Sequence, residues 1–190
     1  MKIGITSDCS SGLEYAPFEH HIKITRTTIH FKDEELIDGI DIKAEEFYRR
    51  LKETDIVPST SAPSLGEISK RVEELKAEGC TDVIHFPISF GLSAYGENLL
   101  NAFDNMVEGV KLHVFNCHSA CLMEGYCAHY AEILAERGYT VEEIMDECQK
   151  FADQTVAYLI VDDLKYLVKN GRLNAVSGFI GGLAKIKPIL

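Results

Sequence analysis

The sequence has no apolar stretch approaching the roughly 20 consecutive residues that a membrane span requires. Its first apolar stretch is interrupted at Asp8 and is too short for a secretory signal peptide. Positive charge is also scarce, because 19 Lys and Arg residues face 30 Asp and Glu residues, for a formal net charge of −11. Such an acidic chain repels polyanions. We therefore expect a cytoplasmic protein with no transmembrane segment and no nucleic acid as its main partner.

The motifs of several enzyme classes are missing as well. The loop that follows residue 88 lacks the P-loop lysine and the GxGxxG spacing, so a nucleotide site is not indicated. It also lacks GxSxG, the elbow motif of serine hydrolases. The six cysteines form no CxxC pair, and the spacing of Cys117 and Cys121 supports a zinc site only weakly. Without a secretion signal, we expect the cysteines to be free thiols.

The 190 residues suffice for one domain with a hydrophobic core, or for one domain and part of a second. The hydrophobic pattern predicts alternating strands and helices, as in a parallel sheet wrapped by helices. Capping signals mark three helix starts, at Asp41, at Ser64 and at Thr140. Predicted strands cover residues 3–5, 22–31, 82–89, 112–115 and 156–161, and predicted helices cover residues 41–51, 64–76, 93–106, 118–136, 141–151 and 162–171.

A new structural unit is expected to begin after the helix at 141–151. We predict an α/β domain over residues 1–154 and the beginning of an incomplete second α/β domain over residues 155–190. The second unit ends with a Gly-rich helix and an apolar strand at 185–190. A segment of this length cannot bury a core of its own, so it packs on the first domain or belongs to a larger one.

The predicted strands lead into loops that are rich in hydroxyl groups. Ligands of parallel α/β sheets bind beyond the carboxyl ends of the strands, and donors at helix N-termini suit a carboxylate or a phosphate. These loops hold residues 6–8, 89–93 and 116–119. The hydroxyl groups of these loops predict an anion site beyond the carboxyl ends of the strands.

Further candidate residues have two interpretations that the residue pattern leaves open. Thr60 and Ser61 form a turn before a helix or contribute hydroxyls to a ligand. Ser93 caps a helix or belongs to an anion cradle. Arg172 is a surface charge near a helix end or points its donors at an acid.

Eight segments together resemble the DegV family, the bacterial fatty-acid-binding proteins that serve fatty acid kinase. They occur in family order across nearly the whole chain. They are Ser7-Asp8-Cys9-Ser10-Ser11, Asp38-Gly39-Ile40-Asp41-Ile42, Glu46-Phe47-Tyr48, Thr60-Ser61-Ala62-Pro63-Ser64, Ile88-Ser89-Phe90-Gly91-Leu92-Ser93, Val161-Asp162-Asp163-Leu164-Lys165-Tyr166-Leu167, Gly171-Arg172 and Lys185-Ile186-Lys187-Pro188-Ile189-Leu190.

The resemblance implies a two-domain α/β protein that buries one long-chain fatty acid between its domains. By motif match, the hydroxyls of Thr60 and Ser93 hold the carboxylate, with Ser61 and Ser89 as possible support. Arg172 corresponds to a docking or head-group contact. A separate fatty acid kinase would phosphorylate the presented carboxylate, so this chain is expected to be neither an enzyme nor a metal or cofactor binder.

The sequence departs from the family pattern in two ways. Ala62, Tyr95 and the pair Asn116-Cys117 replace usual family residues around the head-group site. Family members also continue well beyond residue 190, so we expect the C-terminal third to be lacking and a homodimer to cover exposed apolar surface. Two alternatives remain: a truncated paralogue that acts as an interaction module, and an acyl hydrolase that uses Ser93 with a histidine such as His118.

Overall fold

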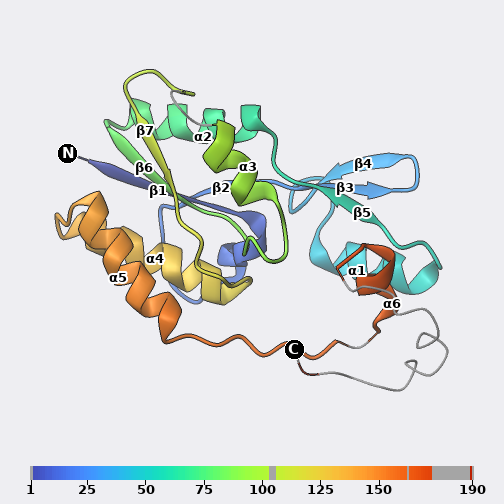
Figure 1. Ribbon diagram of the computed structural model, residues 1–190. Coiled ribbons are helices and arrows are strands. Elements are labelled where there is room, and N and C mark those ends of the chain that lie inside the picture. The colour runs from blue at the N-terminus through green and yellow to red at the C-terminus, as the bar shows by residue number, and fades with distance from the viewer. Residues whose placement is uncertain (1, 103–105, 162, 173–188, 190) are drawn as a thin grey trace.

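Two small sheets form the framework of the computed structural model, which describes residues 2–102, 106–161, 163–172 and 189 (Figure 1). The first sheet is parallel, with the strand order β2-β1-β6-β7. The second is antiparallel, with the order β4-β3-β5. The strand bounds are β1 Ile3–Asp8, β2 Lys23–Thr25, β3 Thr28–Phe31, β4 Glu34–Ile37, β5 Ser59–Ser61, β6 Asp82–Phe86 and β7 Lys111–Val114.

Helices cover both faces of the parallel sheet (Figure 1). On one face lie α2 (Leu65–Ala77) and α3 (Tyr95–Ala102), which bury Ile68, Val72 and Leu99. On the other face lie α4 (Leu122–Glu136) and α5 (Val141–Asp153), which pack with Ile5 and Ile84. The predicted α/β class is confirmed. Within the described parts of the chain, no helix is both long and apolar enough to span a membrane.

The predicted strand at 22–31 is in fact two strands that belong to different sheets. The first part, β2, pairs with β1, whereas the second part, β3, pairs with β4 and β5. The partner changes at Thr27, whose amide donates to Cys9 Sγ and whose carbonyl accepts from the Asp38 amide. Only β3 buries every second side chain, at Ile29 and Phe31, whereas in β2 Thr25 alone is buried. β4 was not predicted, and β5 lies where we expected a turn.

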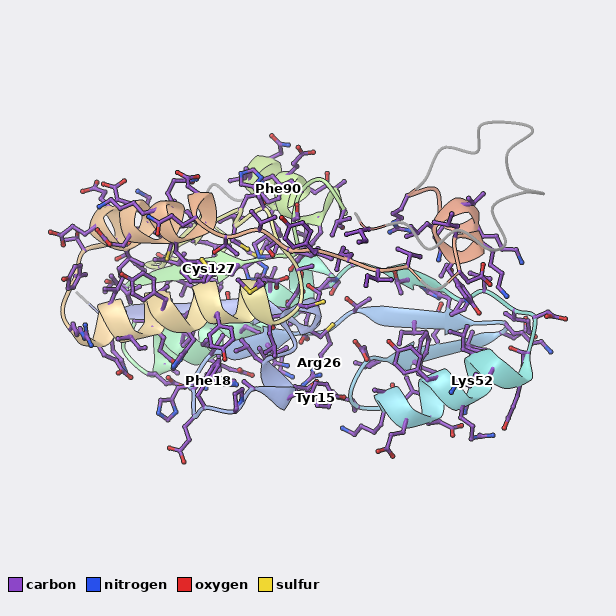
Figure 2. The ribbon with its side chains drawn as sticks, turned by 90° about the horizontal axis from the view of Figure 1, so that it is seen from below. Tyr15, Phe18, Arg26, Lys52, Phe90 and Cys127 are labelled. Carbon is purple, nitrogen blue, oxygen red and sulfur yellow. The ribbon has the colours of Figure 1, made fainter. Side chains whose placement is uncertain are left out.

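The antiparallel sheet is tied to the parallel sheet by a salt bridge between Arg26 and Glu14. Two guanidinium nitrogens of Arg26 each lie 2.7 Å from an oxygen of Glu14, which follows the short 3₁₀ turn after β1. Arg26 Nη1 also donates to the carbonyl of Asp38 at 3.2 Å. Figure 2 shows Arg26 beside Tyr15 at the junction of the two sheets. This pair thus fixes the start of β3 relative to β1.

Two of the three predicted caps are confirmed. Thr140 forms a complete capping box with Glu143, and the Ser64 hydroxyl accepts from the amide of Glu67 at 3.1 Å. The predicted cap at Asp41 is wrong. The carboxylate of Asp41 accepts from the Ile37 amide instead, and α1 (Ala44–Glu53) begins after Lys43 without a side-chain cap.

The strand predicted at 156–161 is also wrong, because among the described residues the segment makes only an isolated bridge between Ile160 and Ile189. An extended connection runs from α5 to the short helix α6 (Lys165–Lys169), which replaces the longer helix predicted at 162–171. α6 and α1 overlap in Figure 1, but Figure 2 shows them on opposite sides of the antiparallel sheet. The predicted Gly-rich helix and nearly all of the last strand lie outside the described residues, and the boundary between 154 and 155 stays a prediction.

Candidate ligand pocket

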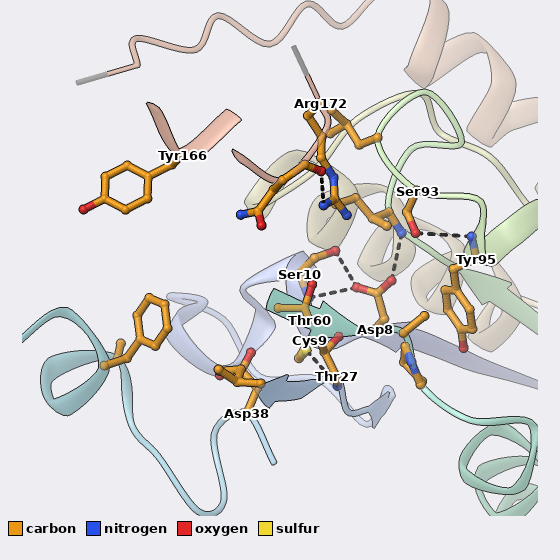
Figure 3. Close-up of a pocket in the computed structure, with 18 of the residues that line it drawn as sticks. Asp8, Cys9, Ser10, Thr27, Asp38, Thr60, Ser93, Tyr95, Tyr166 and Arg172 are labelled. Atoms are coloured by element: carbon orange, nitrogen blue, oxygen red, sulfur yellow. Dashed lines mark hydrogen bonds between the residues drawn. The ribbon is translucent and has the colours of Figure 1, made fainter. Parts of the chain in front are cut away.

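A pocket of about 640 Å³ lies beyond the carboxyl ends of β1 and β6 (Figure 3). Its wall combines loops of the parallel sheet with residues of the antiparallel sheet, α1 and α6. The volume is within the usual range for small-molecule sites, roughly 300–1,000 Å³. The lining residues are Asp8, Cys9, Ser10, Glu14, Tyr15, Thr27, Ile29, Asp38, Ala44, Phe47, Tyr48, Thr60, Ala62, Pro63, Ile88, Leu92, Ser93, Tyr95, Tyr166, Leu167, Asn170 and Arg172.

The pocket has a polar end and a side lined by aromatic rings. Figure 3 shows Asp8, Ser10, Thr60 and Ser93 together at one end, with Tyr166 far from them. The rings of Phe47, Tyr48 and Tyr166 and the side chain of Ile29 contribute apolar wall. A ligand with an anionic head and an apolar tail matches this division.

Ser93 presents its hydroxyl to the pocket from the loop between β6 and α3. Two backbone hydrogen bonds to the carbonyl of Ser89 fold this loop, from the amides of Leu92 and Ser93. Ser93 Oγ accepts from the amide of Tyr95 at 3.2 Å. A hydroxyl is both donor and acceptor, so its hydrogen is left for a ligand. The capping interpretation and the ligand interpretation of Ser93 are therefore compatible.

Thr60 and Ser61 are neighbours on β5 but have different surroundings. Side chains alternate between the two faces of a strand, and only Thr60 lines the pocket. Ser61 Oγ instead contacts His30 Nε2 at 2.6 Å. Ser89 is also absent from the pocket wall, and its hydroxyl accepts from the Gly91 amide at 3.2 Å. Of the four predicted hydroxyls, the fold brings Thr60 and Ser93 into one pocket.

Arg172 reaches the pocket from the segment that follows α6 (Figure 3). Its Nη1 donates to the carbonyl of Asn170 at 2.8 Å, and the residue is exposed. It is the only Lys or Arg among the described residues that line the pocket, where Asp8, Glu14 and Asp38 contribute carboxyl groups.

Behind the polar end lies a network that the sequence analysis missed. Asp8 accepts from the amides of Ser10 at 2.8 Å and Ile88 at 2.9 Å. The Ser10 hydroxyl contacts Asp8 Oδ1 and lies 2.8 Å from Glu124 Oε2. Burial raises the pKa of Asp8 and, together with the nearby charge of Asp8, raises the pKa of Glu124 well above its ordinary value. Glu124 lies in the first turn of α4, where no motif distinguishes it from other acidic residues at helix starts.

The alternative chemistries receive no support from this geometry. Cys9 lines the pocket, but burial raises the pKa of its thiol to about 12, which makes it a poor nucleophile. In the described part of the chain, no hydrogen bond joins Ser93 to a histidine, and His118 contacts Asn116 instead. The expectation of free thiols is confirmed for all six cysteines.

Comparison with known proteins gives a consistent result. Residues 2–190 match the family model described as "Uncharacterised protein, DegV family". A DegV domain-containing protein of Staphylococcus aureus is 35% identical over 192 residues, which cover all of this chain and 66% of that protein. This chain therefore spans slightly less than two thirds of the length of that relative.

Two solved structures are similar in fold. A fatty acid binding DegV family protein of Streptococcus agalactiae matches with a TM-score of 0.86 and 25% identity, over 100% of this chain and 67% of that one. DegV of Bacillus subtilis, described as a fatty acid binding protein, matches with a TM-score of 0.84 and 30% identity over the same shares. The family model, the sequence relative and the shared fold lead to one conclusion: the chain belongs to the DegV family.

Proposed function

We propose that this chain binds one long-chain fatty acid in the pocket, with the carboxylate on the hydroxyls of Thr60 and Ser93. The observation that carries the proposal is that Thr60 on β5 and Ser93 in the loop between β6 and α3 both line the polar end of one pocket with an aromatic side. The solved relatives that are described as fatty acid binding proteins support it.

The head group and the acyl chain of the ligand contribute differently to the binding free energy. A carboxylate that leaves water must regain hydrogen bonds, and Thr60 and Ser93 are donors that meet this need. The acyl chain contributes about 0.8 kcal/mol for each buried CH₂ group, so it supplies most of the affinity. Neither Ser61 nor Ser89 lines the pocket. In this proposal their hydroxyls therefore stabilise the neighbouring segments and do not contact the ligand.

We further propose that the chain is a carrier that itself catalyses no reaction and needs no metal or cofactor. A separate fatty acid kinase would act on the carboxylate in the cytoplasm, with Arg172 at the contact. The exposed position of Arg172 beside the head-group end supports this role. A second copy of the chain is a further proposed partner, because Val156, Tyr158 and Ile160 expose apolar side chains.

The direct experiment is mass spectrometry of an organic extract of the purified protein, with native mass spectrometry of the same sample. We expect one fatty acid per chain, and the native mass also reports the oligomeric state. A folded protein that carries no lipid, and that takes up none when offered long-chain fatty acids, would contradict the proposal and favour an interaction module.

A further inference from the structure

The carboxyl groups of Asp8 and Glu124 are joined by a shared hydroxyl behind the head-group end of the pocket. Ser10 Oγ contacts Asp8 Oδ1 and lies 2.8 Å from Glu124 Oε2. On the far side, Ser7 Oγ lies 3.0 Å from Glu124 Oε1 and 2.8 Å from the carbonyl oxygen of Phe86. Asp8 is 2% exposed and Glu124 is fully buried.

The number of hydrogens in this network favours a protonated carboxyl group. The hydroxyls of Ser7 and Ser10 make four contacts with acceptor oxygens, but they own two hydrogens. A proton on Glu124, donated to Ser7, supplies a third, and the fourth contact is met when the Ser10 hydrogen is shared between Asp8 Oδ1 and Glu124 Oε2. Glu124 is the better holder of this proton, because Asp8 receives two backbone amides that stabilise its charge and Glu124 receives none among the described contacts.

With Glu124 protonated, Asp8 is the ionised member of the pair, and its carboxylate lines the pocket. Among the described residues, the titratable groups that face Glu124 are Asp8 and Cys117, and those around Asp8 are Cys9, Tyr95, Cys117 and, across the pocket, Arg172. Glu14 also lines the pocket, but its charge is paired with Arg26. A fatty acid carboxylate that reaches Thr60 and Ser93 therefore meets an acidic wall with one cation.

We propose that the carboxylate binds together with one proton from solvent, and that Asp8 holds this proton and becomes a third head-group ligand beside Thr60 and Ser93. The inference rests on the proposed fatty acid site. Protonation removes the repulsion between the two carboxylates and gives Asp8 a hydrogen to donate. The open pocket provides the route for the proton, and the neutral Glu124 keeps Ser10 and Asp8 in place.

Burial raises the pKa of Asp8, which favours its protonation on binding. A second anion beside a carboxyl group raises its pKa again. By linkage, affinity must then fall as pH rises, by up to roughly tenfold per pH unit where free Asp8 is ionised. A carboxylate neutralised by Arg172 alone would bind without this pH dependence.

The test is titration calorimetry of the full chain with dodecanoate at neutral pH, in two buffers that differ in their enthalpy of ionisation. We expect the wild type to take up close to one proton per bound ligand. Asp8→Asn should bind with no proton uptake and with an affinity that changes little with pH. Asp82→Asn is the matched control. Asp82 pairs with His113 at the opposite end of the strands, away from the pocket, so this variant should behave as wild type.

The possible outcomes separate the inference from the proposed function. If the wild type binds dodecanoate without proton uptake, or if Asp8→Asn takes up as many protons as wild type, the inference is wrong while the fatty acid site stands. If the wild type binds neither dodecanoate nor a long-chain fatty acid such as hexadecanoate, the proposed function fails and the inference fails with it.

Infrared difference spectroscopy of the wild type keeps the test decisive if Asp8→Asn does not fold. Ligand binding should add a C=O band of a protonated protein carboxyl group. That band should stay in place when the ligand carries ¹³C in its carboxyl group. A band that moves with the label would put the proton on the ligand, and the absence of any new band would show that no carboxyl group is protonated on binding.

Discussion

Glu124 Oε1 lies 3.0 Å from the hydroxyl of Ser7, although the two residues are 117 positions apart in the chain. The contact joins the middle of the chain, in α4, to the end of β1. Through Ser10 the same carboxyl group also reaches the turn that carries Asp8 to the pocket. The packing of α4 against β1 thus positions the polar end of the pocket.

The stability of the protein should depend on the carboxyl group of Glu124. We expect Glu124→Ala to lower the free energy of unfolding by about 2–4 kcal/mol, since it leaves buried hydroxyls unpaired and opens a cavity. Glu124→Gln retains a donor and the side-chain volume, so its cost should be about 1 kcal/mol. Urea unfolding of both variants measures the difference, and equal costs would contradict the role of the hydrogen bonds.

The same group should make stability depend on pH. The pKa of Glu124 is raised in the folded state above its ordinary 4.5, so the folded protein holds a proton that the unfolded chain releases. This contribution is fully present below about pH 4.5 and is lost as pH rises through the folded pKa. Relative to Glu124→Gln, the wild type should therefore be more stable at pH 5 than at pH 8. If the difference in unfolding free energy between wild type and Glu124→Gln were the same at pH 5 and at pH 8, this prediction would be wrong.

His85 should remain neutral throughout the physiological pH range. Its ring is fully buried, its Nδ1 lies 2.8 Å from Thr6 Oγ1, and burial lowers its pKa from 6.5 to about 3. In the folded protein, its NMR signals should not titrate between pH 5 and pH 8, and signals that move over this range would contradict the neutral assignment. The contribution of His85 to stability is present above pH 6.5 and is lost as pH falls toward 3, the opposite direction from Glu124.

Gly125 allows α4 to approach the turn after β1. A Cβ atom at this position would lie 2.7 Å from the carbonyl oxygen of Ser11, which is backbone and cannot rotate away. Gly125→Ala should cost about 1–3 kcal/mol of unfolding free energy despite the better helix propensity of alanine. Gly66→Ala in α2 is the control, because its Cβ would meet only Ser64 Oγ at 3.7 Å, and it should be neutral or stabilising. Similar losses at both positions would contradict the steric explanation.

The head-group hydroxyls can be tested one at a time. Removal of a hydrogen bond to a charged group costs about 1.5–3 kcal/mol, so Thr60→Ala and Ser93→Ala should each weaken fatty acid binding roughly 10- to 150-fold. Thr81→Ala removes a hydroxyl that bonds Asp82 and lies outside the pocket, so its dissociation constant should match wild type. If both pocket variants bind dodecanoate as tightly as wild type in calorimetry, the head-group assignment is wrong.

The sequence by itself determined the fold class and most helix positions. The helices were predicted from apolar residues with a helical period and from caps such as those at Ser64 and Thr140. Both signals depend on residues only a few positions apart, so the local sequence contains them. The candidate residues Thr60 and Ser93 followed from the resemblance of their motifs to the DegV family, since the residue pattern alone left their roles open. The strand prediction at 22–31 failed because alternation records which side chains are buried and does not record which strand pairs with which.

Long-range packing, in contrast, sets which of the predicted hydroxyls line one pocket and which groups lie behind them. Thr60 enters the pocket and Ser61 does not, because the pairing of β5 with β3 fixes which face each side chain takes. Glu124 looks like any acidic residue of a helix until α4 packs against β1 and removes it from water. Long-range packing creates the low-dielectric surroundings that raise the pKa values of Asp8 and Glu124, and no local pattern encodes such surroundings.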